Sequence, residues 1–270
     1  MTLTLKQTEI TALAAELDGA EASRQQIPLI SRRFPDAGLD DAYAVQEAWV
    51  RQKLARGRHR IGWKIGLTSR AMQAALAIDS PDSGVLLDDM RFEDGEAIPR
   101  GRFIQPRIEA EIAFVLARPL AGAGVTVFDV LNATDYVVPA IEILDTRIVR
   151  RDAETGQVRT VIDTIADNAA NAGIITGGRA VRPDATDLRW MGAVVSRNGM
   201  VEETGLGAGV LNDPVRGIVW LVRRLHRYGQ GLEPGEVVLS GSFIRPIECR
   251  PGDTLLADFG RHGTVSTHFA

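Results

Sequence analysis

Three glutamates have the type and spacing to hold a metal ion together. Glu109 and Glu111 lie two residues apart in the otherwise apolar stretch 108–116, and Glu142 lies among the apolar residues of 137–144. In a strand, side chains two residues apart point to the same face, about 6–7 Å apart along the chain. Carboxylates this close resist leaving water unless a cation or a proton lies between them. The spacing therefore predicts a carboxylate metal site, and the alternative is a solvated strand face.

The donor atoms indicate which metal this site would take. All three side chains offer oxygen, and the two stretches contain neither histidine nor cysteine. Hard divalent cations prefer carboxylate oxygen, whereas zinc sites draw on imidazole and thiolate. We therefore expect Mg²⁺, with Mn²⁺ as the alternative.

Lys64 is a second residue that could do chemistry. If 60–66 is a strand, Gly62, Lys64 and Gly66 point to one face, and we expect the two glycines to leave space for a ligand beside the ammonium. A lysine that leaves water can lose its proton near neutral pH or can anchor an anion. The alternative is an exposed lysine on a glycine-rich edge strand.

Thr68 and Ser69 follow this strand and are expected to cap a helix over 70–78. The free N–H groups of such a helix end would suit a carboxylate. The amide-rich segment 167–173 fits either a loop near a site or a plain helix end, and its sequence does not distinguish the two.

The hydrophobic pattern indicates which elements position these residues. Residues 8–22 and 40–49 have helical periodicity, whereas short runs of Val, Ile and Phe bounded by Gly, Pro and Asp dominate from residue 60 onward. Asn198-Gly199 predicts a hairpin turn, and Asp213-Pro214 predicts a helix start. A doubly wound α/β sheet would need regular alternation of strands and helices, which is missing.

These elements predict an α+β fold with a mixed, curled or barrel-like sheet. We expect a helical N-terminal subdomain over 1–60 and a β-rich catalytic body over 61–270, with a single domain overall as the alternative.

Composition and charge exclude several classes of protein. The formal charge of -4 and the pI near 5.7 give no reason to expect nucleic-acid binding. Cys249 is the single cysteine, so neither an intrachain disulfide nor a Cys-rich zinc site can form. The first residues lack a signal-peptide pattern, and no stretch reaches the roughly 18 apolar residues that span a bilayer. A cytoplasmic protein that contacts no membrane is expected.

Several segments together resemble the hydratase and decarboxylase branch of the fumarylacetoacetate hydrolase superfamily, and the resemblance runs over nearly the whole chain. These segments are KIGLTS at 64–69, PDSGVLLDDM at 81–90, PRIEAEIAFVLA at 106–117, NATDYVVPAIEILD at 132–145, DNAANAG at 167–173 and LSGSFIRP at 239–246.

The resemblance implies a mixed β-roll body with a helical N-terminal part and a homo-oligomeric assembly. It implies a magnesium ion held by Glu109, Glu111 and Glu142, and it places Lys64 beside the substrate. The hydrolases of the superfamily use a histidine to activate water, and no match to that histidine occurs in this sequence. The departure argues against a hydrolase.

The implied reaction is magnesium-dependent addition of water to 2-hydroxyhepta-2,4-diene-1,7-dioate, in meta-cleavage catabolism of aromatic compounds such as homoprotocatechuate. Lys64 and Asp82 would move protons, and Arg245 or Arg70 would pair with the distal carboxylate. The substrate site would also include Thr68, Ser69 and Ser242. The alternatives are hydration of 2-oxopent-4-enoate, metal-dependent decarboxylation of 4-oxalocrotonate, and a noncatalytic diacid-binding protein.

Overall fold

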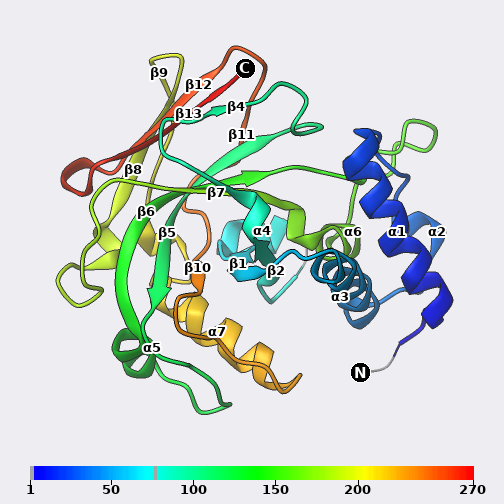
Figure 1. Cartoon of the computed structure of the whole chain (residues 1–270), viewed down its shortest axis with the longest axis horizontal. Coiled ribbons are helices and arrows are strands. Elements are labelled where there is room, and N and C mark those ends of the chain that lie inside the picture. Colours follow the sequence, from blue (N-terminus) through cyan, green and yellow to red (C-terminus); the bar gives the residue numbers. More distant parts are fainter. Residues whose placement is uncertain (1–2, 76–77) are drawn as a thin grey trace.

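The protein consists of two β-sheets with helices packed around them, in a computed structural model that describes residues 3–75 and 78–270. Three helices form the N-terminal part and lie together on one side of the molecule (Figure 1): α1 (Gln7–Ser23), α2 (Ile30–Arg33) and α3 (Leu39–Ala55). The buried face of α1 includes Ile10, Leu13 and Leu17, as its helical period predicts. The expected helical N-terminal part is confirmed.

The larger sheet has eight strands within the described residues, in the order β2-β1-β10-β5-β6-β7-β3, with β11 pairing with β5. These strands are β1 (Arg60–Gly66), β2 (Asp82–Leu87), β3 (Arg91–Phe92), β5 (Arg107–Leu116), β6 (Thr134–Leu144), β7 (Asn171–Thr176), β10 (Val237–Leu239) and β11 (Ile247–Glu248). Most of its pairs are antiparallel, but β1 pairs with β10 and β3 with β7 in parallel. The expected mixed sheet is confirmed.

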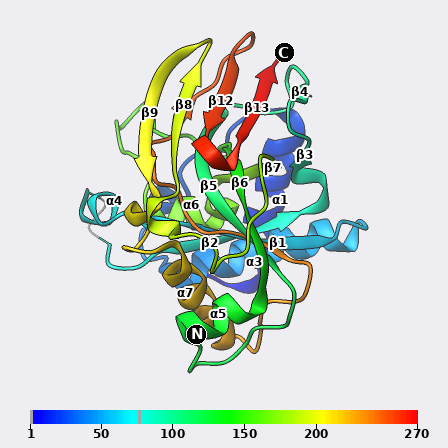
Figure 2. The same cartoon turned by 90° about the vertical axis from the view of Figure 1, so that its left-hand side faces the viewer.

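The smaller sheet has five strands in the part of the chain that the structure describes, in the order β4-β13-β12-β8-β9. Figure 2 shows four of them side by side above the larger sheet. The strands are β4 (Ala97–Ile98), β8 (Gly192–Arg197), β9 (Met200–Leu206), β12 (Thr254–Asp258) and β13 (Thr264–Phe269). Asn198 and Gly199 both have positive φ between β8 and β9, so the predicted Asn-Gly hairpin is confirmed.

The remaining helices are short, apart from α7. They are α4 (Arg70–Ala75), α5 (Val127–Ala133), α6 (Val161–Ala166) and α7 (Pro214–His226), with 3₁₀ turns η1 (Asp88–Met90), η2 (Asn168–Ala170), η3 (Leu188–Trp190), η4 (Gly207–Gly209) and η5 (Gly260–His262). The Asp213 side chain caps α7 as predicted, by accepting from the Val215 N–H. Of the helix expected over 70–78, the structure describes Arg70–Ala75 as helical and Ile78 as not helical, and residues 76–77 lie outside the described residues.

One hydrophobic core connects the helical part with both sheets. It runs from Leu13 in α1 through Ile112 in β5 to Val265 in β13. The division at residue 60 stays a prediction. Among the helices that the structure describes, none is long and apolar enough to cross a membrane.

Candidate metal centre and active site

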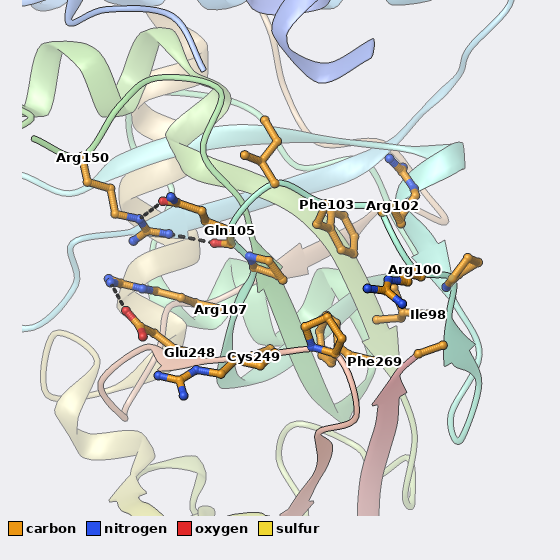
Figure 3. A pocket seen from close by; sticks show the side chains of 17 residues that line it. Ile98, Arg100, Arg102, Phe103, Gln105, Arg107, Arg150, Glu248, Cys249 and Phe269 are labelled. Atoms are coloured by element: carbon orange, nitrogen blue, oxygen red, sulfur yellow. Dashed lines mark hydrogen bonds and ion pairs between the residues drawn. The ribbon is translucent and has the colours of Figure 1, made fainter. Parts of the chain in front are cut away.

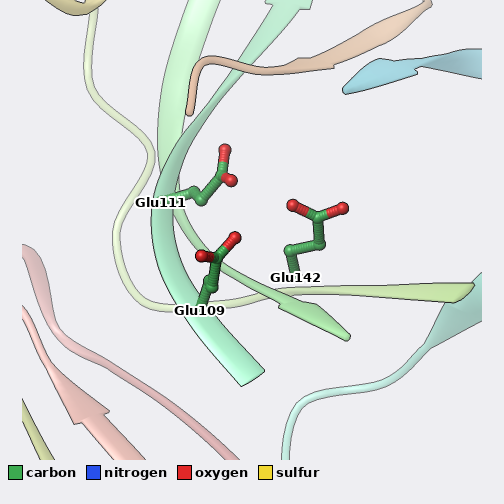
Figure 4. Close-up of side chains that lie close together, drawn as sticks. All are labelled: Glu109, Glu111 and Glu142. Atoms are coloured by element: carbon green, nitrogen blue, oxygen red, sulfur yellow. The ribbon is translucent and has the colours of Figure 1, made fainter. Parts of the chain in front are cut away.

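The pairing of β5 with β6 brings the three glutamates together. Glu109 lies directly opposite Glu142 in this antiparallel register, and Glu111 lies two residues further along β5 on the same face. One carboxylate oxygen from each residue lies within 4.8 Å of the others, and Figure 4 shows the three groups turned toward a common point. Oxygens that ligate one hard cation at about 2.0–2.6 Å lie at most about 4–5 Å apart. The spacing therefore fits a single divalent ion.

Each of the two buried glutamates has one oxygen held by the protein and one left over. The backbone N–H of Gly241 donates to Glu111 Oε2 at 2.7 Å, and Asn171 Nδ2 donates to Glu142 Oε1 at 2.7 Å. Glu111 Oε1 and Glu142 Oε2 are buried and have no hydrogen-bond partner among the described residues. An unpaired buried oxygen costs about 1–3 kcal/mol. A bound cation would satisfy both oxygens.

The electrostatics of the three carboxylates also favour a bound cation. Burial, and next the charge of Glu142, raise the pKa of Glu109 to about 8. The same two causes raise the pKa of Glu111 well above its ordinary value. Either protons or a cation must therefore neutralise these carboxylates at neutral pH. Geometry, unpaired oxygens and charge together fit a divalent metal ion held by this donor set.

Lys64 and Asp82 form a second buried group beside the carboxylates. They come from adjacent strands, since Gly66 of β1 pairs with Asp82 of β2, and both side chains are almost fully buried. Lys64 Nζ lies 3.4 Å from Glu142 Oε1 and donates to the carbonyl oxygen of Ala169 at 3.2 Å. The pair thus adjoins the glutamate cluster.

The protonation of this pair differs from that of the free side chains. Burial lowers the pKa of Lys64, but the carboxylates, Glu142 and Asp82 foremost, raise it by more, so the pKa lies above its ordinary value. Burial also raises the pKa of the Asp82 carboxyl, and the ammonium of Lys64 offsets only part of that rise. The structure therefore favours a protonated Lys64 ammonium over a neutral amine.

The two glycines that flank Lys64 make room for different neighbours. A β-carbon at Gly66 would collide with the side chains of Asp82 and Lys64, and one at Gly62 would collide with the backbone of Val237 in β10. The space at Gly66 is therefore taken by the lysine–aspartate pair, and the space at Gly62 by the neighbouring strand. The expectation that both glycines clear space for a ligand was therefore wrong for Gly62, whereas Gly66 lines the pocket that also includes Lys64.

The segment 167–173, which from its residues fitted either a loop near a site or a plain helix end, lies against the site. Asn168, Ala169 and Ala170 all have positive φ, which costs a non-glycine residue about 1–2 kcal/mol each. The turn presents the Ala169 carbonyl to Lys64 and leads into Asn171, which donates to Glu142. The only sequence signal was its density of amides.

Buried contacts stabilise this strained turn. The carboxylate of Asp167 accepts from the Arg147 and Arg159 guanidinium groups, and Arg147 also donates to the Asn171 carbonyl at 3.0 Å. The Asn168 side chain bonds both the N–H and the carbonyl of Val85 in β2. These contacts fix the groups that hold Lys64 and Glu142.

A pocket of about 420 Å³ opens onto this centre. It contains most of the residues expected from the sequence, but Glu111, Glu142 and Arg70 are not among the residues that line it. Arg70 is exposed at the start of α4. The expected residues in its wall are Lys64, Thr68, Ser69, Asp82, Glu109, Ser242 and Arg245.

Two of these wall residues already have partners. Arg245 is largely exposed, and its Nη2 lies 2.5 Å from Glu203 Oε1, on another wall residue. The Ser242 hydroxyl donates to the Ile244 carbonyl at 2.8 Å and accepts from the Ile244 N–H. A substrate carboxylate that pairs with Arg245 would therefore compete with, or bind beside, the Glu203 carboxylate.

Metal removal should make stability depend on pH in a defined direction. Because the pKa of Glu109 is raised to about 8 in the folded chain, the metal-free folded state binds more protons than the unfolded state above the ordinary value near 4.5. The free energy of unfolding of the metal-free protein should therefore fall as pH rises toward about 8. A divalent cation bound by these carboxylates would replace those protons. The stabilisation by Mg²⁺ should consequently grow with pH.

Calorimetric melting at pH 5 and pH 8.5, with Mg²⁺ or with a chelator, measures this effect. We expect the Mg²⁺-induced rise in Tm to be larger at pH 8.5, by on the order of 5 °C. The contributions of other titrating groups to Tm are the same with Mg²⁺ and with chelator, so they cancel when the two Tm values at one pH are subtracted. An equal rise at both pH values would contradict the assignment of this cluster as the metal site.

Comparison with known proteins gives relatives over the whole chain. The family model for fumarylacetoacetate (FAA) hydrolase C-terminal matches residues 70–270. The 2-oxo-hept-4-ene-1,7-dioate hydratase of Escherichia coli is 55% identical over 259 residues, covering 96% of this chain and 97% of that protein. The 2-keto-4-pentenoate hydratase of Paraburkholderia xenovorans (strain LB400) is 40% identical over 256 residues, covering 95% of this chain and 93% of that protein.

A solved structure is similar in fold over its full length. It is 4-oxalocrotonate decarboxylase from Pseudomonas putida G7 complexed with magnesium and adipate, with a TM-score of 0.93, 34% identity and coverage of 100% of both chains. The same decarboxylase has also been solved with calcium and acetate. The resemblance drawn from the sequence motifs is confirmed by the family match and by these relatives. The chain belongs to the fumarylacetoacetate hydrolase family.

Proposed function

We propose that this chain is a magnesium-dependent hydratase that converts 2-hydroxyhepta-2,4-diene-1,7-dioate into 4-hydroxy-2-oxoheptanedioate. The observation that carries the proposal is a cluster of three convergent carboxylates that adjoins the buried Lys64–Asp82 pair, with Lys64, Asp82 and Glu109 in the wall of one pocket. The substrate follows from the 55% identity to the hydratase of Escherichia coli. The choice of magnesium is supported by the all-oxygen donor set and by the magnesium in the similar decarboxylase structure.

The metal would be held by Glu109, Glu111 and Glu142. When bound, it supplies a Lewis acid for the C1 carboxylate and the C2 oxygen of the substrate. The remaining chemistry is proton transfer and water addition. The 2-hydroxyl loses a proton and C5 gains one, which converts the dienol into a 2-oxo-3-ene. Water then adds with its oxygen at C4 and a proton at C3, so the product contains one water more than the substrate.

Lys64 and Asp82 are the residues that we assign to these proton transfers. The Asp82 carboxyl is buried beside the ammonium and has one oxygen without a hydrogen-bond partner among the described residues. It can therefore accept a proton from the substrate and return it to carbon. The Lys64 ammonium, fixed by Ala169 and Glu142, would stabilise the negative charge that develops on the substrate.

Substrate binding beyond the reacting carbons is assigned to the outer wall of the pocket. Arg245 is the cation proposed for the distal carboxylate, and Arg70 is the weaker candidate because it does not line the pocket. Thr68, Ser69 and Ser242 would contact the body of the substrate. We further propose a homo-oligomer acting in meta-cleavage catabolism of aromatic compounds, in the cytoplasm.

The second candidate function is decarboxylation of 4-oxalocrotonate. The observation that favours it is the full-length structural similarity to the decarboxylase of Pseudomonas putida G7, at a TM-score of 0.93. The same three glutamates and Lys64 would serve that reaction, since loss of carbon dioxide also leaves negative charge on the C2 oxygen. Sequence identity separates the two candidates, with 55% to the hydratase against 35% to a decarboxylase of Pseudomonas sp. (strain CF600).

One assay distinguishes these functions. The ultraviolet absorbance of 2-hydroxyhepta-2,4-diene-1,7-dioate is followed with purified protein, with Mg²⁺ or with a chelator, and the product is weighed by mass spectrometry. We expect a metal-dependent decay with the gain of one water. With 4-oxalocrotonate as a parallel substrate, faster metal-dependent release of carbon dioxide would replace the hydratase by the decarboxylase.

A further inference from the structure

A second cavity, of about 400 Å³, lies at the start of β5 and does not share its wall with the metal centre. It is formed by the segments 98–107 and 248–251, by Arg150, and by 269–270. None of the three glutamates and neither member of the Lys64–Asp82 pair lines it. Figure 3 shows the side chains that surround it. The reaction proposed above does not use this cavity.

The side chains of the cavity carry a large excess of positive charge. Its lining includes a single acidic side chain, Glu248, whose Oε1 accepts from Arg107 Nη2 at 2.9 Å. Five arginines line the same cavity. They are Arg100, Arg102, Arg107, Arg150 and Arg250.

Two of these arginines, Arg107 and Arg150, lie next to each other, and Arg107 already pairs with the Glu248 carboxylate. Arg150 donates to the side-chain oxygen of Gln105 at 3.3 Å and to its carbonyl at 2.9 Å, and both acceptors are neutral. Burial, and next the charge of Arg107, lower the pKa of Arg150 to about 10. Arg107 Nε is buried and has no hydrogen-bond partner in the part of the chain that the structure describes. The two guanidinium groups therefore carry positive charge and N–H donors with which an added anion could pair.

Aromatic side chains form the rest of the wall. In Figure 3, Phe103 and Phe269 lie between the Arg107–Arg150 side and Arg100. Both rings line the cavity, and Phe269 is buried. An apolar body packed beside these rings would be stabilised by the apolar surface that both remove from water. A bare inorganic anion would leave them uncovered.

We propose that this cavity is a binding site for an organic anion, with a carboxylate held by Arg107 and Arg150 and an apolar body packed against Phe103 and Phe269. A guanidinium pairs with carboxylate through two parallel hydrogen bonds, and such charge-assisted bonds are about twice as strong as neutral ones. The carboxylate neutralises the paired arginines and accepts from donors that the protein leaves free. The site is separate from the active site, so its ligand can be present while substrate is bound.

Titration calorimetry of the Mg²⁺-loaded protein with hexanoate tests the proposal. We expect hexanoate binding to weaken at least tenfold in Arg150→Gln, because the substitution removes one guanidinium of the pair. Arg150→Lys keeps the charge and loses the paired donors. Its affinity for hexanoate should lie between that of wild type and that of Arg150→Gln. Arg182→Gln is the matched control, since this arginine is exposed and lies outside the cavity. Equal hexanoate binding in wild type and Arg150→Gln would overturn the site.

Two further measurements distinguish a site for an organic carboxylate from a site for an inorganic anion and from a contact between copies of the chain. Inorganic phosphate should bind more weakly than hexanoate, and equal or tighter binding of phosphate would overturn the role of the apolar body. Sedimentation velocity should give the same oligomeric state for wild type and Arg150→Gln. A smaller assembly in the variant would show that the cavity is a contact between copies of the chain, which would also overturn the proposal.

Discussion

Glu111→Gln is expected to abolish turnover and leave the fold intact. Glu111 Oε2 accepts from the Gly241 N–H, and Oε1 is the unpaired oxygen that faces the cluster. The amide removes one of the negative charges that a divalent ion needs, and its NH₂ group cannot ligate a cation. We expect kcat to fall at least about 10³-fold, as when a group that stabilises transition-state charge is lost. Metal affinity should fall together with the rate.

The same substitution should stabilise the metal-free protein. Glu111 is fully buried, and its raised pKa shows that burial opposes its charged form. A neutral amide of the same shape removes that penalty, so the Tm in chelator should equal or exceed that of wild type. Glu47→Gln is a matched control, because Glu47 is exposed on α3 and pairs with Arg51 at the surface. Unchanged hydration of the diene by Glu111→Gln would remove this residue from the metal site.

The parts of the structure that depend on local periodicity could be predicted from the sequence. The alternation around Glu109 and Glu111 gave β5 and its common face, and the Asn198-Gly199 and Asp213-Pro214 signals gave a hairpin and a helix start. Each of these features depends on residues within a few positions of each other. The residue type alone therefore carries the information.

The parts of the structure that depend on contacts between distant segments could not be predicted from the sequence. The turn at 168–170 has a backbone conformation that alanine disfavours, and contacts with distant residues stabilise it, such as that of Asp167 with Arg147, 20 residues away. The space beside Gly66 is filled by Asp82 from the neighbouring strand, which no spacing within β1 reveals. The pairing of Arg245 with Glu203 likewise joins two segments far apart in the chain. Sequence periodicity does not encode such pairings.

Lys64→Ala is expected to reduce the rate far more than it reduces metal affinity. The ammonium is almost fully buried, with Nζ 3.4 Å from Glu142 Oε1 and 3.2 Å from the Ala169 carbonyl. It offers no lone pair to a cation while protonated, and its charge opposes that of a metal on the same carboxylates. Metal binding should therefore be unchanged or tighter. The rate should fall about 10²–10⁴-fold, the range for loss of a group that acts in proton transfer.

Two comparisons make the Lys64 result specific. Lys64→Met keeps most of the side-chain volume without the charge, so a rate as low as that of Lys64→Ala assigns the loss to the ammonium rather than to a cavity. Lys6→Ala, at an exposed lysine, should retain the wild-type rate. Metal affinity comes from calorimetric titration with Mg²⁺, and kcat comes from the absorbance assay. A variant that lost metal and rate in proportion would make Lys64 a support for Glu142 instead of a participant in the reaction.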